Sequence, residues 1–287
     1  MTGPLPAGAD IFVPDGAGCR EALARVTDLG VMAHPDDLEL LAIGAIGECI
    51  GDPTRWFGGV VCTDGAGGVT DPAEVRSTED LAAARRVEQR EAADLGGYSI
   101  MVQLGHSSAW VRDPTGNRGL IDEIAWLVDQ THPTNLYTHN LLDKHETHVA
   151  VSAAVVTAVR HLDLTARPSR MVGVESWRDL DWLPDHEKVR IDVSAHADLA
   201  ESLISVHRSQ LGPKRYDLAA AGRRVANATI FEPRQADEAH QVIVAMDLTP
   251  LARNDQMDPL QFACSAIDRF RAEAEQTLSR WFDGGRD

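Results

Sequence analysis

The chain has 287 residues, of which 44% are hydrophobic and 25% are charged, and its formal net charge is −17. This length accommodates one large α/β domain, and the composition is that of a globular protein. The negative charge excludes nucleic acid and membrane surfaces as favoured partners, because their phosphate groups would be repelled.

Neither the cysteines nor the N-terminal residues show a pattern of cross-linking or secretion. The four cysteines are far apart and form no CxxC pair, so the sequence indicates neither a disulfide framework nor a cysteine zinc site. The N-terminus lacks the basic and apolar regions of a secretory signal, and no apolar run reaches the ~18 residues of a transmembrane helix. We expect a cytoplasmic protein.

Short apolar runs alternate with helical segments along the chain. Residues 1–26 begin with a stretch rich in Gly and Pro and predict an irregular lead-in. Strands are expected at residues 27–33, 57–63, 100–104, 135–138 and 171–175. Helices are expected at residues 38–50, 77–95, 120–130 and 148–162. A more helical C-terminal part follows, with helices at 197–207, 216–229 and 259–281 and an edge strand at 241–246. This pattern predicts a single α/β domain over 1–287, with helices on both faces of a mostly parallel sheet.

Polar side chains follow four of the expected strands at the point where each strand ends. His34 to Asp37 follow the first strand, residues 63–65 close the second, residues 105–106 follow the third and residues 139–148 follow the fourth. Ligand sites of open α/β sheets lie outside the carboxyl ends of the strands. We therefore expect these side chains to converge on one site.

Two of these segments supply a set of metal-binding side chains. His34 is followed by Asp36 and Asp37, and His145 and His148 lie three residues apart at the start of an expected helix. Residues three apart share a helix face, so both imidazoles can reach one cleft. Two histidines and one aspartate with an open position suit a catalytic Zn²⁺ or Fe²⁺. Because adjacent residues point in different directions, one aspartate is expected to bind the metal and the other to act as a general base.

Such a site would support hydrolysis of an amide. A bound metal lowers the pKa of its water from about 15.7 to about 7. A carboxylate beside it takes the proton as the water attacks a carbonyl. A histidine outside the metal shell can stabilise the oxyanion and protonate the leaving amine.

With these residues, the sequence resembles the PIG-L/LmbE family of metal-dependent de-N-acetylases from about Asp28 to Asn227. The resemblance rests on AHPDD after the first strand and on the later HxxH. It also includes TDG at 63–65, RxxE at 85–88, LG at 95–96 and HRSQ at 207–210. It implies a Rossmann-like fold and the removal of acetyl from N-acetylglucosamine-type conjugates.

The resemblance also implies a role for each matching residue of the site. His34, Asp37 and His148 would bind one divalent metal, Zn²⁺ in first place and Fe²⁺ in second. Asp36 would be the general base, and His145 the general acid or oxyanion stabiliser.

Two further residues, Arg85 and Asp64, would bind substrate according to the resemblance. An alternative for Arg85 is an ion pair on the surface of an amphipathic helix. The implied partner is a small amino-sugar conjugate whose aglycone the sequence does not identify. A homo-oligomer is compatible with the sequence, which gives no oligomeric state.

The sequence departs from the family pattern in two places. Many members have HPDH where this chain has His145-Glu146-Thr147-His148, so a carboxylate that would orient a neighbouring imidazole is missing. Leu38 stands where the usual AHPDDE has glutamate, and we expect no metal role for the glutamate that follows, Glu39.

Simpler interpretations stand beside the catalytic one. The HPDD segment could be a polar turn that caps the following helix, and His139 could serve either the structure or the support of a metal ligand. An amidase acting on another N-acyl group, or a non-catalytic metal- or sugar-binding protein, are the alternatives for function. Asp36 argues against the non-catalytic alternative, because a binding site alone needs no second adjacent carboxylate.

Overall fold

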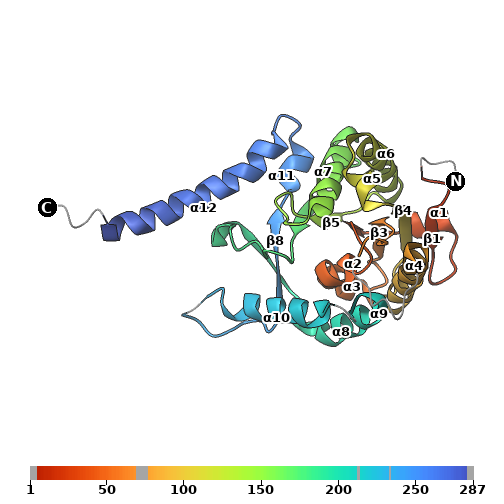
Figure 1. Ribbon diagram of the computed structural model, residues 1–287, viewed down its shortest axis with the longest axis horizontal. Helices are drawn as coiled ribbons and strands as arrows, with labels where there is room; N and C mark the ends of the chain where they lie inside the picture. The colour runs from red at the N-terminus through yellow and green to blue at the C-terminus, as the bar shows by residue number, and fades with distance from the viewer. Residues whose placement is uncertain (1–4, 69–76, 212–213, 233, 283–287) are drawn as a thin grey trace.

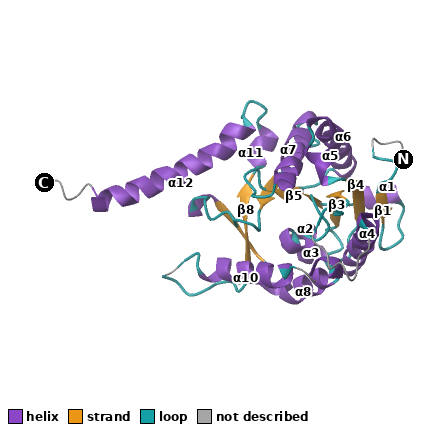
Figure 2. Cartoon of the chain, viewed as in Figure 1, coloured by secondary structure: helices purple, strands orange, loops and turns teal. Residues whose placement is uncertain are grey.

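A computed structural model describes residues 5–68, 77–211, 214–232 and 234–282. Its centre is an eight-stranded sheet in the order β1-β4-β3-β2-β5-β6-β8-β7 (Figure 2). The strands are β1 (Asp10–Phe12), β2 (Asp28–Met32), β3 (Phe57–Thr63), β4 (Ile100–His106), β5 (Asn135–His139), β6 (Arg170–Val174), β7 (Lys188–Asp192) and β8 (Val242–Asp247). The five strands from β4 to β6 in this order are parallel, and β1, β8 and β7 add antiparallel pairings. The predicted Rossmann-like, mostly parallel sheet is confirmed.

Helices cover both faces of this sheet (Figure 1). One layer contains α1 (Cys19–Ala24), α5 (Ser108–Arg112), α6 (Pro114–Thr131), α7 (Glu146–His161) and α11 (Thr249–Arg253). The other contains α2 (Asp37–Leu41), α3 (Ile43–Cys49), α4 (Thr78–Leu95), α8 (Ala197–Ser205), α9 (Arg208–Leu211) and α10 (Tyr216–Thr229). Two 3₁₀ turns, η1 (Asp185–Glu187) and η2 (Ser194–His196), flank β7, and the last helix is α12 (Pro259–Phe282). Each face of the sheet thus has its own apolar core.

The central strands are buried on both faces. Every residue of β2 and β3 is buried, as expected of parallel strands between two helical layers. In β2, a Cβ on Gly30 would lie 2.5 Å from Leu38 of α2 and 2.9 Å from Phe57. The absence of a side chain at Gly30 therefore allows α2 to lie close to the sheet, which fixes the position of Asp37 at its first turn.

The chain changes direction across the sheet at β2 and β5. From β2 it proceeds to β3 and β4 on one side, and then returns to β5 and β6 on the other. In doubly wound folds, the crevice at such a switch point is the preferred ligand site. His34 to Asp37 follow β2 here, and residues 140–148 follow β5.

The structure corrects the expected elements at several places. The lead-in predicted to be irregular contains β1, which pairs with β4, and α1, which packs against α6. The helix expected at 38–50 is two helices, because Ala42 leaves the helical conformation at φ −112° and ψ 15°. Helical structure also begins earlier than the expected residue 120, with α5 and the first turns of α6.

The strand expected at residues 241–246, on an edge of the sheet, lies inside the sheet. β8 lies between β6 and β7, and its first five residues are buried. Its unbroken apolar run, VIVAM, is typical of a strand covered on both faces. The edge is formed instead by β7, a strand that the sequence analysis missed because charged residues alternate along it.

No helix in the described part of the chain is long and apolar enough to cross a membrane.

Asp179, in the segment after β6, combines burial with a left-handed backbone. Its side chain is buried, its Oδ2 atom lacks a hydrogen-bond partner within the described residues, and its φ is 55°. Burial raises the pKa of Asp179 to about 6, against an ordinary value of 3.8. The charged carboxylate therefore opposes folding.

We expect Asp179→Asn to stabilise the protein above pH 6. Between pH 3.8 and about 6 the native state binds more protons than the unfolded state, so the free energy of unfolding falls as pH rises through this range. The difference between these two pKa values corresponds to at most about 3 kcal/mol. Asparagine tolerates the same left-handed backbone. Urea unfolding should be measured from pH 4 to pH 8. Over this range the free energy of unfolding of the variant should rise by ~1–3 kcal/mol relative to that of the wild type. If the free energies of unfolding of the two proteins changed in parallel with pH, the raised pKa of Asp179 would be contradicted.

Candidate metal centre

The HPDD segment forms a tight turn between β2 and α2. Asp36 has φ 91°, a left-handed conformation that is rare for a residue with a side chain, and Asp37 begins α2. The N–H of His34 donates to Asp37 Oδ2 (2.7 Å), and the N–H of Asp37 donates to the His34 carbonyl (3.3 Å). The turn therefore directs His34 and Asp37 to the same point.

Three donor atoms meet at this point. His34 Nδ1 lies 3.2 Å from Asp37 Oδ2 and 3.1 Å from His148 Nε2, and His148 Nε2 lies 3.6 Å from Asp37 Oδ2. Donors about 2.1 Å from a tetrahedral ion lie roughly 3.4 Å from one another. The triangle therefore has the size and the donor chemistry of a site for one metal ion.

Electrostatics favours the charged form of Asp37. Burial alone would raise its pKa, but His148 and His139 hold the pKa of Asp37 well below its usual range. A carboxylate must be ionised to bind a metal, so Asp37 is prepared as a ligand.

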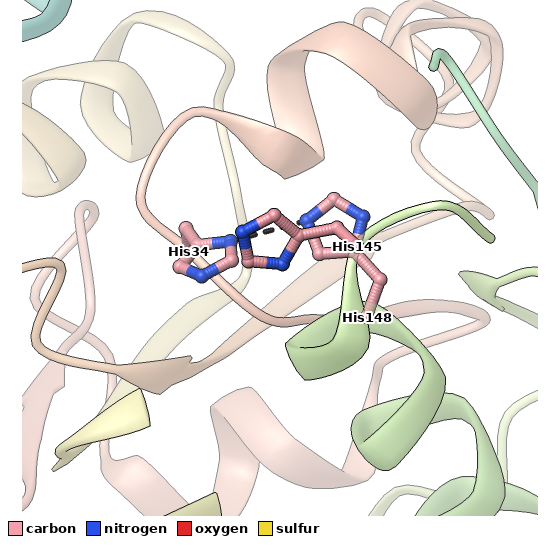
Figure 3. A group of neighbouring side chains, drawn as sticks. All are labelled: His34, His145 and His148. Atoms are coloured by element: carbon pink, nitrogen blue, oxygen red, sulfur yellow. Dashed lines mark hydrogen bonds between the residues drawn. The ribbon is translucent and has the colours of Figure 1, made fainter. Parts of the chain in front are cut away.

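Two other histidines lie close enough to be considered as ligands. His145 lies with His34 and His148 in one cluster of donor atoms within 4.8 Å, and Figure 3 shows these three imidazoles together. A second cluster joins Asp37, His139 and His148. His139 Nε2 accepts the Ala33 N–H (2.9 Å), so the lone pair of this atom is already engaged. We therefore assign His139 to holding the end of β2, a role that the sequence analysis left open.

His148 receives a carboxylate partner that the sequence analysis missed. Its Nδ1 donates to Asp143 Oδ2 (3.0 Å), and Asp143 Oδ1 accepts the N–H of His145 (2.8 Å). A metal-binding histidine usually has such a partner on its second nitrogen, which fixes the tautomer and the ring orientation. In the sequence, the only sign of this partner is that an aspartate lies in the loop ahead of α7.

His145 has no comparable partner. Its Nδ1 is buried without a hydrogen bond within the described residues, and the next residues in the helix are Glu146 and the buried Thr147. Burial, and then the neighbouring His148 and His34, lower the pKa of His145 to about 4. These observations are consistent with the expectation that the missing HPDH carboxylate leaves an imidazole without support.

Asp36 is not one of the three donors, and its carboxylate has a different electrostatic environment. Burial and the adjacent Asp37 raise the pKa of Asp36 well above its usual range, and Arg85 is the main opposing charge. Arg85 is itself buried, and its Nη1 donates to the carbonyl of Gly65. A Cβ on Gly65 or on Gly68 would lie 2.8 Å or 2.4 Å from atoms of Arg85, so this glycine loop encloses the guanidinium.

Asp64 lies outside this arrangement. It does not line the cavity, and its Oδ1 accepts the N–H of Ala66 (2.9 Å) within its own turn. His106, at the end of β4, pairs with Glu123 (2.7 Å) and stacks on Trp110. The structure thus brings together the histidine-rich and aspartate-rich positions after β2 and β5, but not those after β4.

A buried polar network supports the turn from below. The N–H of Asp36 donates to Gln89 Oε1 (3.3 Å), and Gln89 Nε2 donates to Glu39 Oε1 (2.8 Å). Glu39 also accepts the hydroxyl of Tyr98 (2.7 Å) and pairs with His207 Nε2 (3.1 Å). Glu39 is thus fully engaged inside the protein, in agreement with the expectation that it has no metal role.

The HRSQ segment, whose role the sequence left open, contributes directly to this support. Gln210 Nε2 donates to the Pro35 carbonyl (2.8 Å), while Ser209 binds Glu88 through its N–H (2.8 Å) and its hydroxyl (2.6 Å). Residues of α4 and α9 therefore hold Pro35 and Asp36 from two sides.

The donor triangle forms part of the wall of a cavity of about 560 Å³. Asp36, Arg85 and His145 share this wall, together with Trp177 and Tyr216, whose rings lie edge to face. The dimensions match those of pockets that bind small molecules.

Residues 29–159 match the family model described as PIG-L, GlcNAc-PI de-N-acetylase. The predicted resemblance to the PIG-L family is thereby confirmed for this segment of the chain, which carries all five of the expected metal and catalytic residues. No curated protein matches the chain.

Several solved structures share the fold. The N,N'-diacetylchitobiose deacetylase from Pyrococcus horikoshii superposes with a TM-score of 0.62 at 19% identity, over 79% of this chain and 85% of its own. The conserved protein TT1542 from Thermus thermophilus has a TM-score of 0.60 at 21% identity, over 78% and 94%. GalB, the 4-carboxy-2-hydroxymuconate hydratase from Pseudomonas putida, has a TM-score of 0.62 at 18% identity, over 78% and 96%. These likenesses show a common fold, on which more than one reaction is found.

We expect Asp143→Asn to weaken metal binding about 10- to 100-fold, because His148 loses the carboxylate that orients it. Competition with a chromogenic chelator would measure the affinity for Zn²⁺. Glu123→Gln is the matched control, since it removes the carboxylate partner of His106, a histidine outside the donor triangle. Equal metal affinities of the two variants would refute the role of Asp143.

Proposed function

We propose that the protein is a metal-dependent hydrolase that removes the N-acetyl group from an N-acetylglucosamine-type sugar conjugate. The proposal rests on one observation above all. Three donors with the spacing of metal ligands share a cavity with a second buried carboxylate and a further histidine. The match to the PIG-L family supports the same reaction class.

His34, Asp37 and His148 would hold one divalent ion, with Zn²⁺ as the first choice and Fe²⁺ as the second. When bound, such an ion polarises a carbonyl oxygen and lowers the pKa of a water molecule.

Asp36 is the proposed general base. The attacking water loses its proton to the Asp36 carboxylate while the water oxygen bonds to the acetyl carbon. Arg85, enclosed beside Asp36 by the glycine loop, keeps the carboxylate in place and offers its charge to substrate hydroxyl or phosphate oxygens. We do not extend the substrate-binding role to Asp64, whose carboxylate caps its own turn.

His145 is the proposed partner of the leaving group. It stabilises the oxyanion that forms on the acetyl oxygen. Because its low pKa leaves His145 neutral at rest, it relays to the amine nitrogen the proton that Asp36 took from the water, as the C–N bond breaks. Acetate and a free amino sugar result. Trp177 stacks parallel to His145 at a ring-centroid distance of 6.4 Å and would contact the apolar face of a sugar ring next to the scissile amide.

An amidase acting on another N-acyl small molecule is the second candidate. The cavity has an aromatic wall and a charged floor but no feature that selects a sugar over another ring. A screen of sugar and non-sugar amides separates the two candidates.

We expect Asp36→Asn to lower kcat by at least about 10³-fold and to leave the metal content unchanged, because the base is lost while the donor triangle is intact. Acetate release from N-acetylglucosamine, N,N'-diacetylchitobiose and phosphoryl or aryl N-acetylglucosaminides would be measured, alongside other N-acetyl amines. Asp129→Asn, an exposed substitution on α6, is the control. Acetate release by the wild type only from non-sugar amides would favour the second candidate, and undiminished activity of Asp36→Asn would refute the mechanism.

We expect Gln210→Met to lower kcat about 10- to 100-fold with little change in KM, because a shift of the turn misplaces Asp36. The unsatisfied Pro35 carbonyl should also cost about 1–3 kcal/mol of stability. Gln103→Met is the matched control, since this buried glutamine also donates to a backbone carbonyl, that of Arg86, but outside the cavity. A similar loss of kcat in both variants would indicate general destabilisation instead.

A further inference from the structure

The last helix, α12, leaves the body of the protein over most of its length (Figure 1). Its first turns are anchored, because Ala263 and Ala266 are buried and Arg269 Nη2 binds Glu187 (2.6 Å). After Arg269, every residue up to Phe282 is exposed. In the part of the chain that the structure describes, the hydrogen bonds and ion pairs of residues 270–282 stay within the helix.

This projecting segment carries large apolar side chains on one face. Ile267, Phe270, Leu278 and Trp281 are 39%, 43%, 53% and 81% exposed. At 100° per residue, these four side chains form a stripe on the same face of the helix as the buried Ala263 and Ala266. The face that packs against the body of the protein therefore continues along the projecting segment, where it is exposed. A single helix of this length is only marginally stable in water, and exposed aromatic stripes mark interaction sites.

The stripe is symmetric along the helix. With Ala274 at its centre, the successive spacings of Ile267, Phe270, Ala274, Leu278 and Trp281 are three, four, four and three residues. An antiparallel copy centred on Ala274 would place Ile267 opposite Trp281 and Phe270 opposite Leu278. The small Ala274 would lie at the crossing point, where two helices approach most closely.

Charged side chains lie on both flanks of the stripe. Arg271 and Glu275 lie on one flank and bind each other within the helix (2.8 Å). In the antiparallel pair, each Arg271 would also lie next to the Glu275 of the other copy, so that two arginines enclose two neighbouring glutamates along this flank. On the other flank, Glu273 would face its own copy, a like-charge contact that no arginine of the pair encloses.

We propose that α12 is a dimerisation helix, which pairs through this stripe with α12 of a second copy of the chain in an antiparallel, twofold-symmetric arrangement. The buried area would be on the order of 1,000 Å² in total, at the lower end of specific interfaces. We therefore expect a dissociation constant in the micromolar range. A twofold contact of one patch with itself is the commonest route to a soluble dimer.

Sedimentation velocity of the full-length protein from about 1 to 100 µM tests the proposal. The wild type should pass from monomer to dimer in this range. Phe270→Glu/Leu278→Glu should remain monomeric, whereas the matched control Gln276→Glu/Ser279→Glu, with the same added charge on the opposite face, should still dimerise. Glu273→Gln should tighten the dimer a few-fold. A wild type that stays monomeric, forms larger oligomers only, or dimerises equally well with the stripe substituted would overturn the proposal.

Cross-linking tests the register. In a Cys264→Ser background, Ala274→Cys should form a disulfide-linked dimer rapidly on mild oxidation, because the two copies meet at this residue. Ala272→Cys, on the opposite face, should not. Equal cross-linking of the two variants would refute the arrangement, and so would binding of the monomer to phosphatidylcholine–phosphatidylglycerol vesicles through the same stripe.

Discussion

The left-handed backbone of Asp36 is the constraint around which the rest of the site is arranged. It lets four consecutive residues place His34 and Asp37 in the donor triangle while Asp36 stays outside the triangle, under the influence of the Arg85 charge. Such a conformation costs on the order of 1–3 kcal/mol and persists only where the surroundings impose it. Here the surroundings are the end of β2, held by His139, and the glutamines that bind Pro35 and Asp36.

This requirement connects sequence motifs that have little meaning separately. The helix α4 contributes Arg85, Glu88 and Gln89, and the short α9 contributes Ser209 and Gln210. Glu88 binds Ser209 and so joins the two helices, while Gln89 and Gln210 reach the turn from either side. Because the partners are buried, each unmet hydrogen bond would be costly, and the network specifies a single geometry for the turn.

Local signals were sufficient for part of the structure. The boundaries of β3 and α10 agree with those expected from the sequence, because an unbroken apolar run and an amphipathic period identify them. The place of β8 inside the sheet depends on its pairing with the distant β6 and β7, which no local pattern encodes. Similarly, short motifs placed His34, Asp37 and His148 in one site, but the support from Asp143 and Gln210 depends on loop geometry and on a contact across 175 residues.

The two adjacent aspartates illustrate how the environment separates two chemically identical groups. Asp37 lies among imidazoles that lower its pKa, whereas burial and the charge of Asp37 raise the pKa of Asp36. A ligand has to remain ionised, and a base has to accept a proton readily, so opposite shifts favour one role for each residue. Asp37 also makes the shift of Asp36 larger, since the ionised Asp37 disfavours a second charge on its neighbour. The division of roles therefore follows from placing one carboxylate inside the histidine cluster and its neighbour just outside it.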